Sequence, residues 1–300
     1  MSPIRIFVVG RSGQVAQALV AAADGRADLS LHCVGRPDAD LAAPDQLLSA
    51  LDAHRPDVIL NAAAYTAVDK AESEPELADA INHIGPKRLA EWSGAAGIPL
   101  IHMSTDCVFD GTKTGGYVET DPPSPISVYG RTKADGETAV AAATHKHLIA
   151  RVCWVHSPFA GSFPKIMLTL AKDRETLSVV GDQWGRPTHA SDLADGLLTM
   201  ATRCLQPDFA DWGIYHLAGA GETNRADMAK AIFEDSAAQR GPVADVVPIS
   251  TDDYGAAAAR PLNARLDSPR AKAVFGWTPV PWRHRLTDTV NSLLDGELSS

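Results

Sequence analysis

A tyrosine and a lysine stand four residues apart in the segment VYGRTKADGE, as Tyr129 and Lys133. The segment is rich in residues that favour helices, and residues four apart project from one face of a helix. A phenol with an ordinary pKa near ~10 is a poor proton donor at neutral pH, but an ammonium ~4 Å away contributes about 4 kcal/mol in a partly shielded site. The spacing therefore predicts that Lys133 lowers the pKa of Tyr129 and that Tyr129 acts as a proton donor.

The same spacing also fits an ordinary helix with a packed tyrosine and a solvated lysine. The segment STDCVFDG at 104–111 favours the chemical interpretation, because it follows an apolar run at 98–103. Ligands of open α/β sheets bind at the carboxyl ends of parallel strands, which is where this segment is expected to lie. We predict that the hydroxyl of Thr105 (or Ser104) hydrogen-bonds a substrate carbonyl that Tyr129 protonates, with Lys133 as the third catalytic residue.

A glycine-rich turn opens the chain. Gly10 and Gly13 lie between an apolar run at 4–10 and an amphipathic run at 14–23. Glycines there allow a tight turn, and the N-terminus of the following helix offers unpaired N–H groups to a pyrophosphate. Glycines that only turn the chain are the alternative, but the order of strand, turn and helix favours a dinucleotide site.

The next predicted strand, at 29–35, ends before Arg36. A site that prefers NAD usually places an acidic residue there, on the ribose 2′-hydroxyl, whereas an arginine favours the 2′-phosphate of NADPH. We therefore predict NADPH, with NADH as the alternative if Arg36 is only a solvated loop residue. Asp40 and Leu41 follow and are expected on the adenine side.

The elements that must position these residues alternate between strands and helices. In the first half, strands are predicted at 4–10, 29–35, 57–63, 98–104 and 147–155, and helices at 14–23, 44–54, 75–94 and from Tyr129 onward. This order is typical of parallel strands joined by crossover helices. It predicts an α/β fold in which residues 1–151 form a Rossmann-type doubly wound parallel sheet.

The second half is less regular. Strands are predicted at 177–183 and 213–219, and helices at 191–203, 225–238 and 284–295. We expect residues 152–300 to form mainly a smaller α/β substrate-binding lobe, with some segments returning to the Rossmann domain.

Composition excludes several classes of protein. A chain of 300 residues with 45% hydrophobic content is long enough for a large core, and its net charge of −10 disfavours a nucleic-acid partner. The four cysteines form no CxxC pair, so neither a zinc site nor a disulfide framework is predicted. The start MSPIRIFVVG lacks the layout of a signal peptide and no apolar run is long enough to span a membrane, which predicts a cytoplasmic protein.

The chain resembles the dTDP-4-dehydrorhamnose reductase family, a group of extended short-chain dehydrogenases/reductases. The resemblance runs from end to end. It is carried by GRSGQV (10–15), PDVILNAAAYTAVDKAESEP (56–75), STDCVFDG (104–111), PISVYGRTKADGE (125–137), ARVCWV (150–155), DQWGRPT (182–188) and ARPLNARLD (259–267).

This resemblance implies NAD(P)H-dependent reduction of dTDP-4-dehydro-L-rhamnose to dTDP-L-rhamnose. It implies that Tyr129 is the proton donor and that Lys133 tunes it and holds the nicotinamide ribose. On the substrate side, Thr105 orients the sugar carbonyl, Asp106 contacts the sugar and Trp154 lines the sugar pocket. On the cofactor side, the implied contacts are Gly13, Gln14 and Val15 at the pyrophosphate, Asp40 and Leu41 at the adenine side, and Ala63, Ala64, Tyr65 and Thr66 at the middle.

Several positions depart from the family pattern. Cys107 replaces a usual tyrosine, which leaves open a reductase of another nucleoside diphosphate 4-keto-sugar. Ala16 replaces the third glycine of the turn and should still pack closely. Some members bind magnesium through glutamates at a dimer interface, but Gln17 and Ala18 stand there in this chain, so no metal is predicted and a homodimer stays open. A non-catalytic cofactor-binding regulatory subunit is the alternative from another class, and the intact catalytic set argues against it.

Overall fold

The computed structural model describes residues 2–298, and its largest element is a sheet of six parallel strands in the order β10-β5-β4-β3-β1-β2. The strands are β1 (Ile4–Val9), β2 (Leu29–Val34), β3 (Val58–Asn61), β4 (Leu100–Thr105), β5 (His147–Val152) and β10 (Gly213–Leu217). Their central members are mostly apolar because both faces of the sheet are covered, and Phe7 and Val8 are both fully buried.

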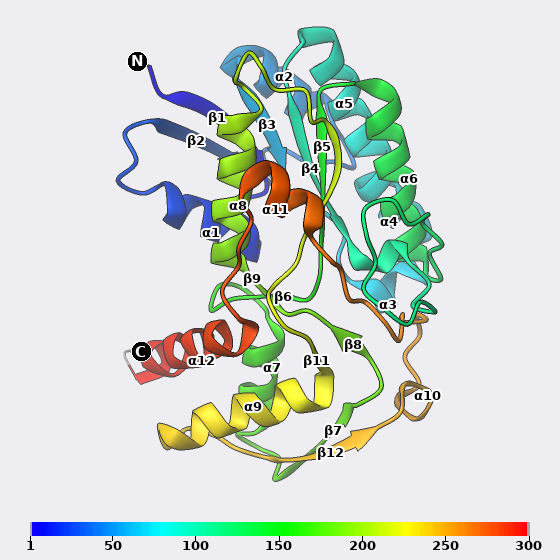
Figure 1. The fold of residues 1–300 in the computed structure, drawn as a ribbon, viewed down its shortest axis with the longest axis vertical. Helices are drawn as coiled ribbons and strands as arrows, with labels where there is room; N and C mark the ends of the chain where they lie inside the picture. Colours follow the sequence, from blue (N-terminus) through cyan, green and yellow to red (C-terminus); the bar gives the residue numbers. More distant parts are fainter. Residues whose placement is uncertain (1, 299–300) are drawn as a thin grey trace.

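Helices cover both faces of this sheet (Figure 1). One face packs against α1 (Gln14–Ala23), α8 (Ala190–Arg203) and α11 (Pro269–Phe275). The other packs against α2 (Asp45–His54), α5 (Gly85–Ala96) and α6 (Val128–Ala143). The predicted Rossmann-type doubly wound fold is confirmed.

The helix predicted at 75–94 is interrupted. It consists of α4 (Pro75–Asp79), a π-helical turn η1 (Ala80–Ile84) and α5. Pro86 has no N–H to give to the carbonyl of Asn82 one turn earlier, so a regular α-helix cannot continue through this point. The wider turn places the buried Asn82 side chain against the backbone of Tyr65. The Asn82 amide oxygen accepts from the Tyr65 N–H at 2.8 Å, and its NH₂ donates to the Tyr65 carbonyl at 3.1 Å.

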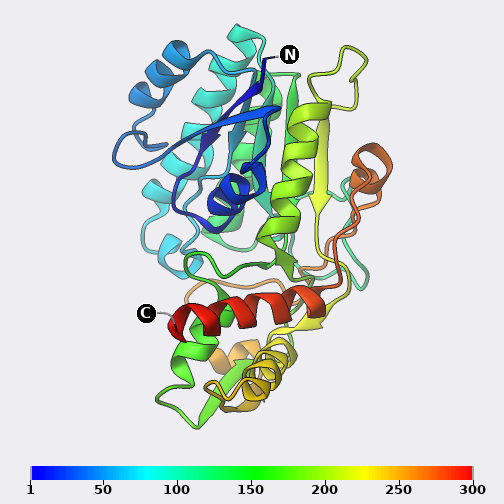
Figure 2. The same ribbon diagram turned by 90° about the vertical axis from the view of Figure 1, so that its left-hand side faces the viewer.

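The second lobe has its own core. β7 (Thr176–Val180) and β12 (Asp245–Ile249) pair in parallel, and α7 (Phe163–Leu170), α9 (Arg225–Ala238) and α12 (Trp282–Leu298) pack around a shared apolar cluster. Figure 2 shows α12, in red, lying between this lobe and the six-stranded sheet. The remaining short elements are β6 (Val155–His156), β8 (Trp184–Gly185), β9 (Thr188–His189), β11 (Thr223–Asn224), α3 (Val68–Ala71), η2 (Asp106–Val108) and α10 (Thr251–Tyr254).

The strand predicted at 147–155 ends early, at Val152. Trp154 has a φ of 44°, in the left-handed region that an extended strand does not use. The chain therefore leaves the sheet here and enters the second lobe through β6.

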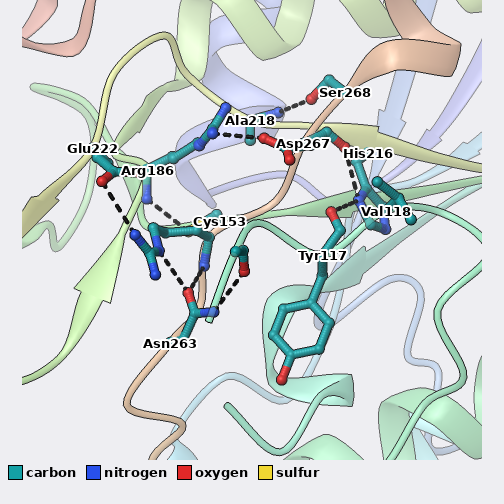
Figure 3. A network of polar contacts seen from close by, with 12 residues as sticks. Tyr117, Val118, Cys153, Arg186, His216, Ala218, Glu222, Asn263, Asp267 and Ser268 are labelled. Atoms are coloured by element: carbon teal, nitrogen blue, oxygen red, sulfur yellow. Dashed lines mark hydrogen bonds and ion pairs between the residues drawn. The ribbon is translucent and has the colours of Figure 1, made fainter. Parts of the chain in front are cut away.

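A polar network ties the segment 259–267 to both halves of the molecule (Figure 3). The amide of Asn263 donates to the carbonyls of Lys113 and Gly115 at 2.5 and 2.8 Å, and Arg186 pairs with Asp267 at 2.6 Å. This segment is therefore a fixed wall beside the carboxyl edge of the sheet. No helix within residues 2–298 combines the length and the apolar character needed to cross a bilayer.

Candidate active site

The N-terminus of α6 is fixed by two side chains. The hydroxyl of Ser127 accepts from the Gly130 N–H at 3.1 Å, and the carboxylate of Glu72 accepts from the Val128 N–H at 2.8 Å. Gly130 packs directly against η2, where a Cβ would clash with the carbonyl oxygen of Cys107. These contacts bring Tyr129, the next residue after Val128, up to the end of β4.

The structure brings Thr105, Asp106 and Tyr129 together at that end. The Thr105 hydroxyl donates to Asp106 Oδ1 at 2.8 Å, accepts from the Cys107 N–H at 3.1 Å and lies near enough to the Tyr129 phenol to affect its pKa. All three side chains are buried, with 5%, 5% and 8% of their surface exposed. The structure therefore assembles the side chains that were predicted at the end of this strand, and Cys107 follows directly in η2.

The prediction that Lys133 lowers the pKa of Tyr129 is wrong for this structure. Burial raises the pKa of Tyr129 above its ordinary value, the nearby Cys107 adds to the rise, and the Thr105 hydroxyl opposes it. The Lys133 ammonium nitrogen lies elsewhere, because it donates to the Met103 carbonyl at 2.7 Å. The sequence spacing placed both side chains on one helix but did not place their polar atoms.

Lys133 is itself perturbed. Only 2% of it is exposed, and burial lowers its pKa to about 8, with the charge of Glu137 acting in the opposite direction. Its Nζ also lies 3.3 Å from Nε2 of His102, whose Nδ1 lies 3.0 Å from the amide nitrogen of Asn61. Neither His102 nor Asn61 was predicted as a site residue.

This set of residues lies at the same sheet edge as the glycine turn. Asn61 ends β3, the neighbour of both β1 and β4, and the Ala62 N–H donates to the Val9 carbonyl at 2.9 Å. Gly10 has a φ of 138° and lies against Ala62 and Ala16. The Tyr129–Lys133 pair and the turn therefore lie at one edge of the sheet, where the ligand crevice of this architecture is expected.

The turn fits a dinucleotide. Gly13 is the N-cap of α1 and gives it no side-chain cap, and no heavy atom lies within 4 Å of the place where a Gly13 Cβ would stand. The first N–H groups of α1, from Gln14 and Val15, are thus open to an anion. The Gln14 side chain is occupied, since it accepts from the Ser157 hydroxyl at 2.8 Å.

The end of β2 carries two cations rather than one. Arg36 is exposed there, and Arg11 lies beside Gly35 and pairs with the exposed Asp38 at 3.0 Å. Sequence reasoning missed Arg11, although it stands inside the GRSGQV turn. Two arginines at this position suit a ribose 2′-phosphate.

The remaining predicted cofactor residues line the ends of β2 and β3. Asp40 Oδ1 accepts from the Ala42 N–H at 2.9 Å, and Leu41 is buried in the core. Ala63 donates to Asn61 Oδ1 at 3.2 Å, and the Tyr65 phenol donates to Glu74 at 2.7 Å. Partly buried Ala64 and exposed Thr66 flank Tyr65. Their contacts with a cofactor stay predictions.

An unpredicted arginine lies on the substrate side. The guanidinium of Arg225 lies 3.6 Å from the ring centroid of Trp154, and among residues 2–298 it forms no ion pair. Burial lowers the pKa of Arg225 to about 10, while Asp106 raises it and Arg260 lowers it, so both charges act on it. The sequence offered one indication of a binding role. Arg225 begins the helix α9, where the helix dipole disfavours a cation, so an arginine at this position is unusual unless it binds something.

Arg260 connects the wall at 259–267 with α3. It pairs with Asp69 at 2.8 Å, and the same carboxylate accepts from the Ala258 N–H at 3.1 Å. Asp69 belongs to the AAAYTAVDKAE segment, so this contact joins that segment to the wall at 259–267.

No group of three or more His, Cys, Asp or Glu side chains in the described part of the chain is arranged to hold a metal ion. Gln17 donates from its amide to the Ser12 carbonyl at 2.7 Å. The predicted absence of a metal stays a prediction.

The RmlD substrate binding domain family matches residues 4–294. A dTDP-4-dehydrorhamnose reductase of Sinorhizobium fredii (strain NBRC 101917 / NGR234) is 44% identical over 292 residues, covering 97% of this chain and 98% of that protein. The crystal structure of the dTDP-4-dehydrorhamnose reductase of Bacillus anthracis in complex with NADP has a TM-score of 0.87 at 32% identity, covering 96% of this chain and 98% of that one. A dTDP-4-dehydrorhamnose reductase structure from Clostridium acetobutylicum has a TM-score of 0.90 at 30% identity, covering 97% and 100%.

Proposed function

This chain belongs to the RmlD substrate binding domain family, and from that premise we propose that it reduces dTDP-4-dehydro-L-rhamnose to dTDP-L-rhamnose with NADPH. The observation that carries the proposal is the joint burial of Thr105, Tyr129 and Lys133 beside the glycine turn. A protein that only binds a cofactor has no need of a shielded phenol next to a buried hydroxyl at this place.

Tyr129 delivers the proton. When bound, the reduced nicotinamide supplies the hydride to the sugar ketone. The raised pKa of Tyr129 keeps its phenol protonated at neutral pH, and an alkoxide is more basic than a phenolate, so the proton passes from Tyr129 to the sugar oxygen. The Thr105 hydroxyl, which lies beside Tyr129 in the buried group, orients that oxygen.

The other residues bind and orient. The N–H groups of Gln14 and Val15, with Gly13 before them, would hold the pyrophosphate, and Lys133 the nicotinamide ribose. Asp106 and Trp154 contact the sugar. We assign Arg225 to the diphosphate of the substrate, since it is a partly buried cation of the crevice without a carboxylate partner in residues 2–298.

The activity is tested with purified protein, dTDP-4-keto-6-deoxy-L-mannose and NADPH or NADH. We expect loss of the absorbance of the reduced nicotinamide and formation of dTDP-rhamnose. Absence of turnover with both coenzymes would reject the proposal and favour a regulatory subunit. A panel of other nucleoside diphosphate 4-keto-sugars tests the effect of Cys107 on the choice of sugar.

Arg36→Asp should raise the Michaelis constant for NADPH roughly tenfold to a hundredfold, because it replaces a charge-assisted contact with the 2′-phosphate by repulsion. The constant for NADH should change little. Steady-state kinetics with each coenzyme measure this, and Arg174→Asp, an exposed position on the second lobe, controls for net charge. An unchanged NADPH constant in the Arg36 variant defeats the assignment.

Arg225→Met should raise the Michaelis constant for the dTDP-sugar roughly tenfold to a hundredfold and weaken inhibition by dTDP to a similar degree. Methionine keeps an unbranched chain on Trp154 and removes only the charge. Arg174→Met is the control. The dissociation constant of NADPH, measured by fluorescence, should stay within about twofold, so equal losses for both ligands would indicate a structural effect instead.

A cytoplasmic location and a homodimer are further parts of this proposal. The four cysteines are free, which suits a reducing compartment. Light scattering of the purified protein tests the dimer.

A further inference from the structure

A chain of hydrogen-bonding groups runs through the sheet beneath the catalytic pair. The Ala63 N–H lies 3.2 Å from Asn61 Oδ1, and Asn61 Nδ2 lies 3.0 Å from His102 Nδ1. His102 Nε2 lies 3.3 Å from Lys133 Nζ, which lies 2.7 Å from the Met103 carbonyl. Asn61 and His102 are fully buried and Lys133 is 2% exposed, so bulk water does not compete for these contacts.

The donors and acceptors of these groups fix the direction in which each hydrogen bond is donated. A backbone N–H only donates, so the atom of Asn61 that faces Ala63 is the carbonyl oxygen and the atom that faces His102 is the NH₂. His102 Nδ1 must therefore accept. A neutral imidazole with an accepting Nδ1 carries its proton on Nε2, and that N–H points at Lys133.

An ammonium has three donors and no lone pair, so it cannot accept from the Nε2–H of His102. A neutral amine can accept from His102 and still donate to the Met103 carbonyl. We propose that His102, oriented by Asn61, is a positioning residue that presents an N–H to Lys133 and thereby favours the neutral amine at the active site.

The surroundings agree with this assignment. Burial lowers the pKa of Lys133 to about 8, and burial places the pKa of His102 well below its ordinary value, so the ring stays neutral. The titratable groups that act on Lys133 are His102 from β4 and Glu137 from its own helix. Glu137 favours the ammonium but is already paired with Arg151 of β5 at 2.6 Å.

The functional consequence rests on the role proposed above for Lys133. A lysine held this way titrates within the working pH range instead of staying charged throughout it. The proton state of the group that holds the ribose then depends on two residues that touch neither cofactor nor substrate. The tautomer of His102 is measured on the resting protein, so that result is independent of any turnover.

The first experiment reads the tautomer. Protein labelled with ¹⁵N-histidine is examined by long-range ¹H–¹⁵N correlation NMR, and His102 is identified by the signal lost in His102→Gln. Above the pKa of Lys133, about 8, where the amine is neutral, we expect a neutral ring protonated at Nε2. A ring protonated at Nδ1, or at both nitrogens, overturns the proposal.

The second experiment reverses the direction of hydrogen-bond donation between His102 and Lys133. Asn61→Asp keeps the oxygen that faces Ala63 and replaces the NH₂ by a second acceptor, so His102 should move its proton to Nδ1 and accept from the Lys133 ammonium with Nε2. The titration midpoint of Lys133, followed by NMR of ¹³C-lysine and assigned with Lys133→Met, should rise by roughly one to two pH units.

Asn61→Leu is the matched control, because it removes both polar contacts without adding a charge. It should shift the Lys133 midpoint less than Asn61→Asp and should not fix His102 in the Nδ1–H form. An unchanged midpoint in Asn61→Asp contradicts the proposal. If Asn61→Asp does not fold, the tautomer of the unaltered protein still decides the question.

Discussion

Replacing Tyr129 with phenylalanine is expected to lower kcat by roughly a thousandfold or more, within the range that a positioned general acid contributes. The substitution removes only the phenolic oxygen. The ring will keep its packing, since it lies in a small apolar cluster with Ala71, Ala78 and Val128. The loss will therefore report the proton transfer and not a collapse of the site.

Three measurements separate this result from a structural one. The dissociation constant of NADPH should stay within a few-fold of that of the unaltered protein. The melting temperature should change little. Tyr254→Phe, the same chemical change at a tyrosine with 59% of its surface exposed, should leave kcat unchanged. A near-normal rate in Tyr129→Phe would reject Tyr129 as the proton donor.

The fold was largely predictable because strands and helices of a doubly wound sheet have distinct patterns. Residues 4–10 and 57–63 are short apolar runs and 14–23 is amphipathic, and the structure has β1, β3 and α1 at these places. The errors occurred where one residue changes the backbone. Pro86 breaks the hydrogen-bonding pattern of a helix from within, and the positive φ of Trp154 ends a strand inside an apolar run.

The assembly of the catalytic group was predictable from topology. Thr105 ends a parallel strand, and the start of the helix with Tyr129 and Lys133 must return to the same sheet edge. The direction of the pKa shift was not predictable, because it depends on which atoms the Lys133 amine contacts. His102 and Asn61 were missed because a histidine and an asparagine inside apolar strands look like ordinary core positions in the sequence.

Arg225 and Arg11 were missed for other reasons. The role of Arg225 depends on how residues 152–300 fold back toward the sheet, and these residues carry little periodic pattern. Arg11 was missed because its neighbours Gly35 and Asp38 follow the next strand and are not adjacent to the turn in the sequence. The stacking of Arg225 on Trp154 joins two residues that lie 71 positions apart in the numbering, so no local signal contains it.

A buried ion pair behind the site supports the second large prediction. Arg151 of β5 and Glu137 of α6 are 1% and 5% exposed at their side chains, and the Arg151 Nε and Nη2 atoms both donate to the carboxylate. Glu137 lies one helical turn after Lys133, so the pair fixes the part of α6 that carries the catalytic lysine. Removing one partner leaves an uncompensated charge in the interior, which costs more than the lost contact itself.

Glu137→Leu should therefore lower the free energy of unfolding by about 3–5 kcal/mol, measured by urea denaturation. Asp57→Leu, which breaks the exposed pair between Arg5 and Asp57, should cost less than about 1 kcal/mol. The double variant Glu137→Leu/Arg151→Met separates the two causes. Arg151 Nη1 is buried without a hydrogen-bond partner among the described residues, so replacing both charges should restore much of the loss. A double variant as unstable as Glu137→Leu would mean that the attraction between the charges, and not the burial of one alone, holds α6 against β5.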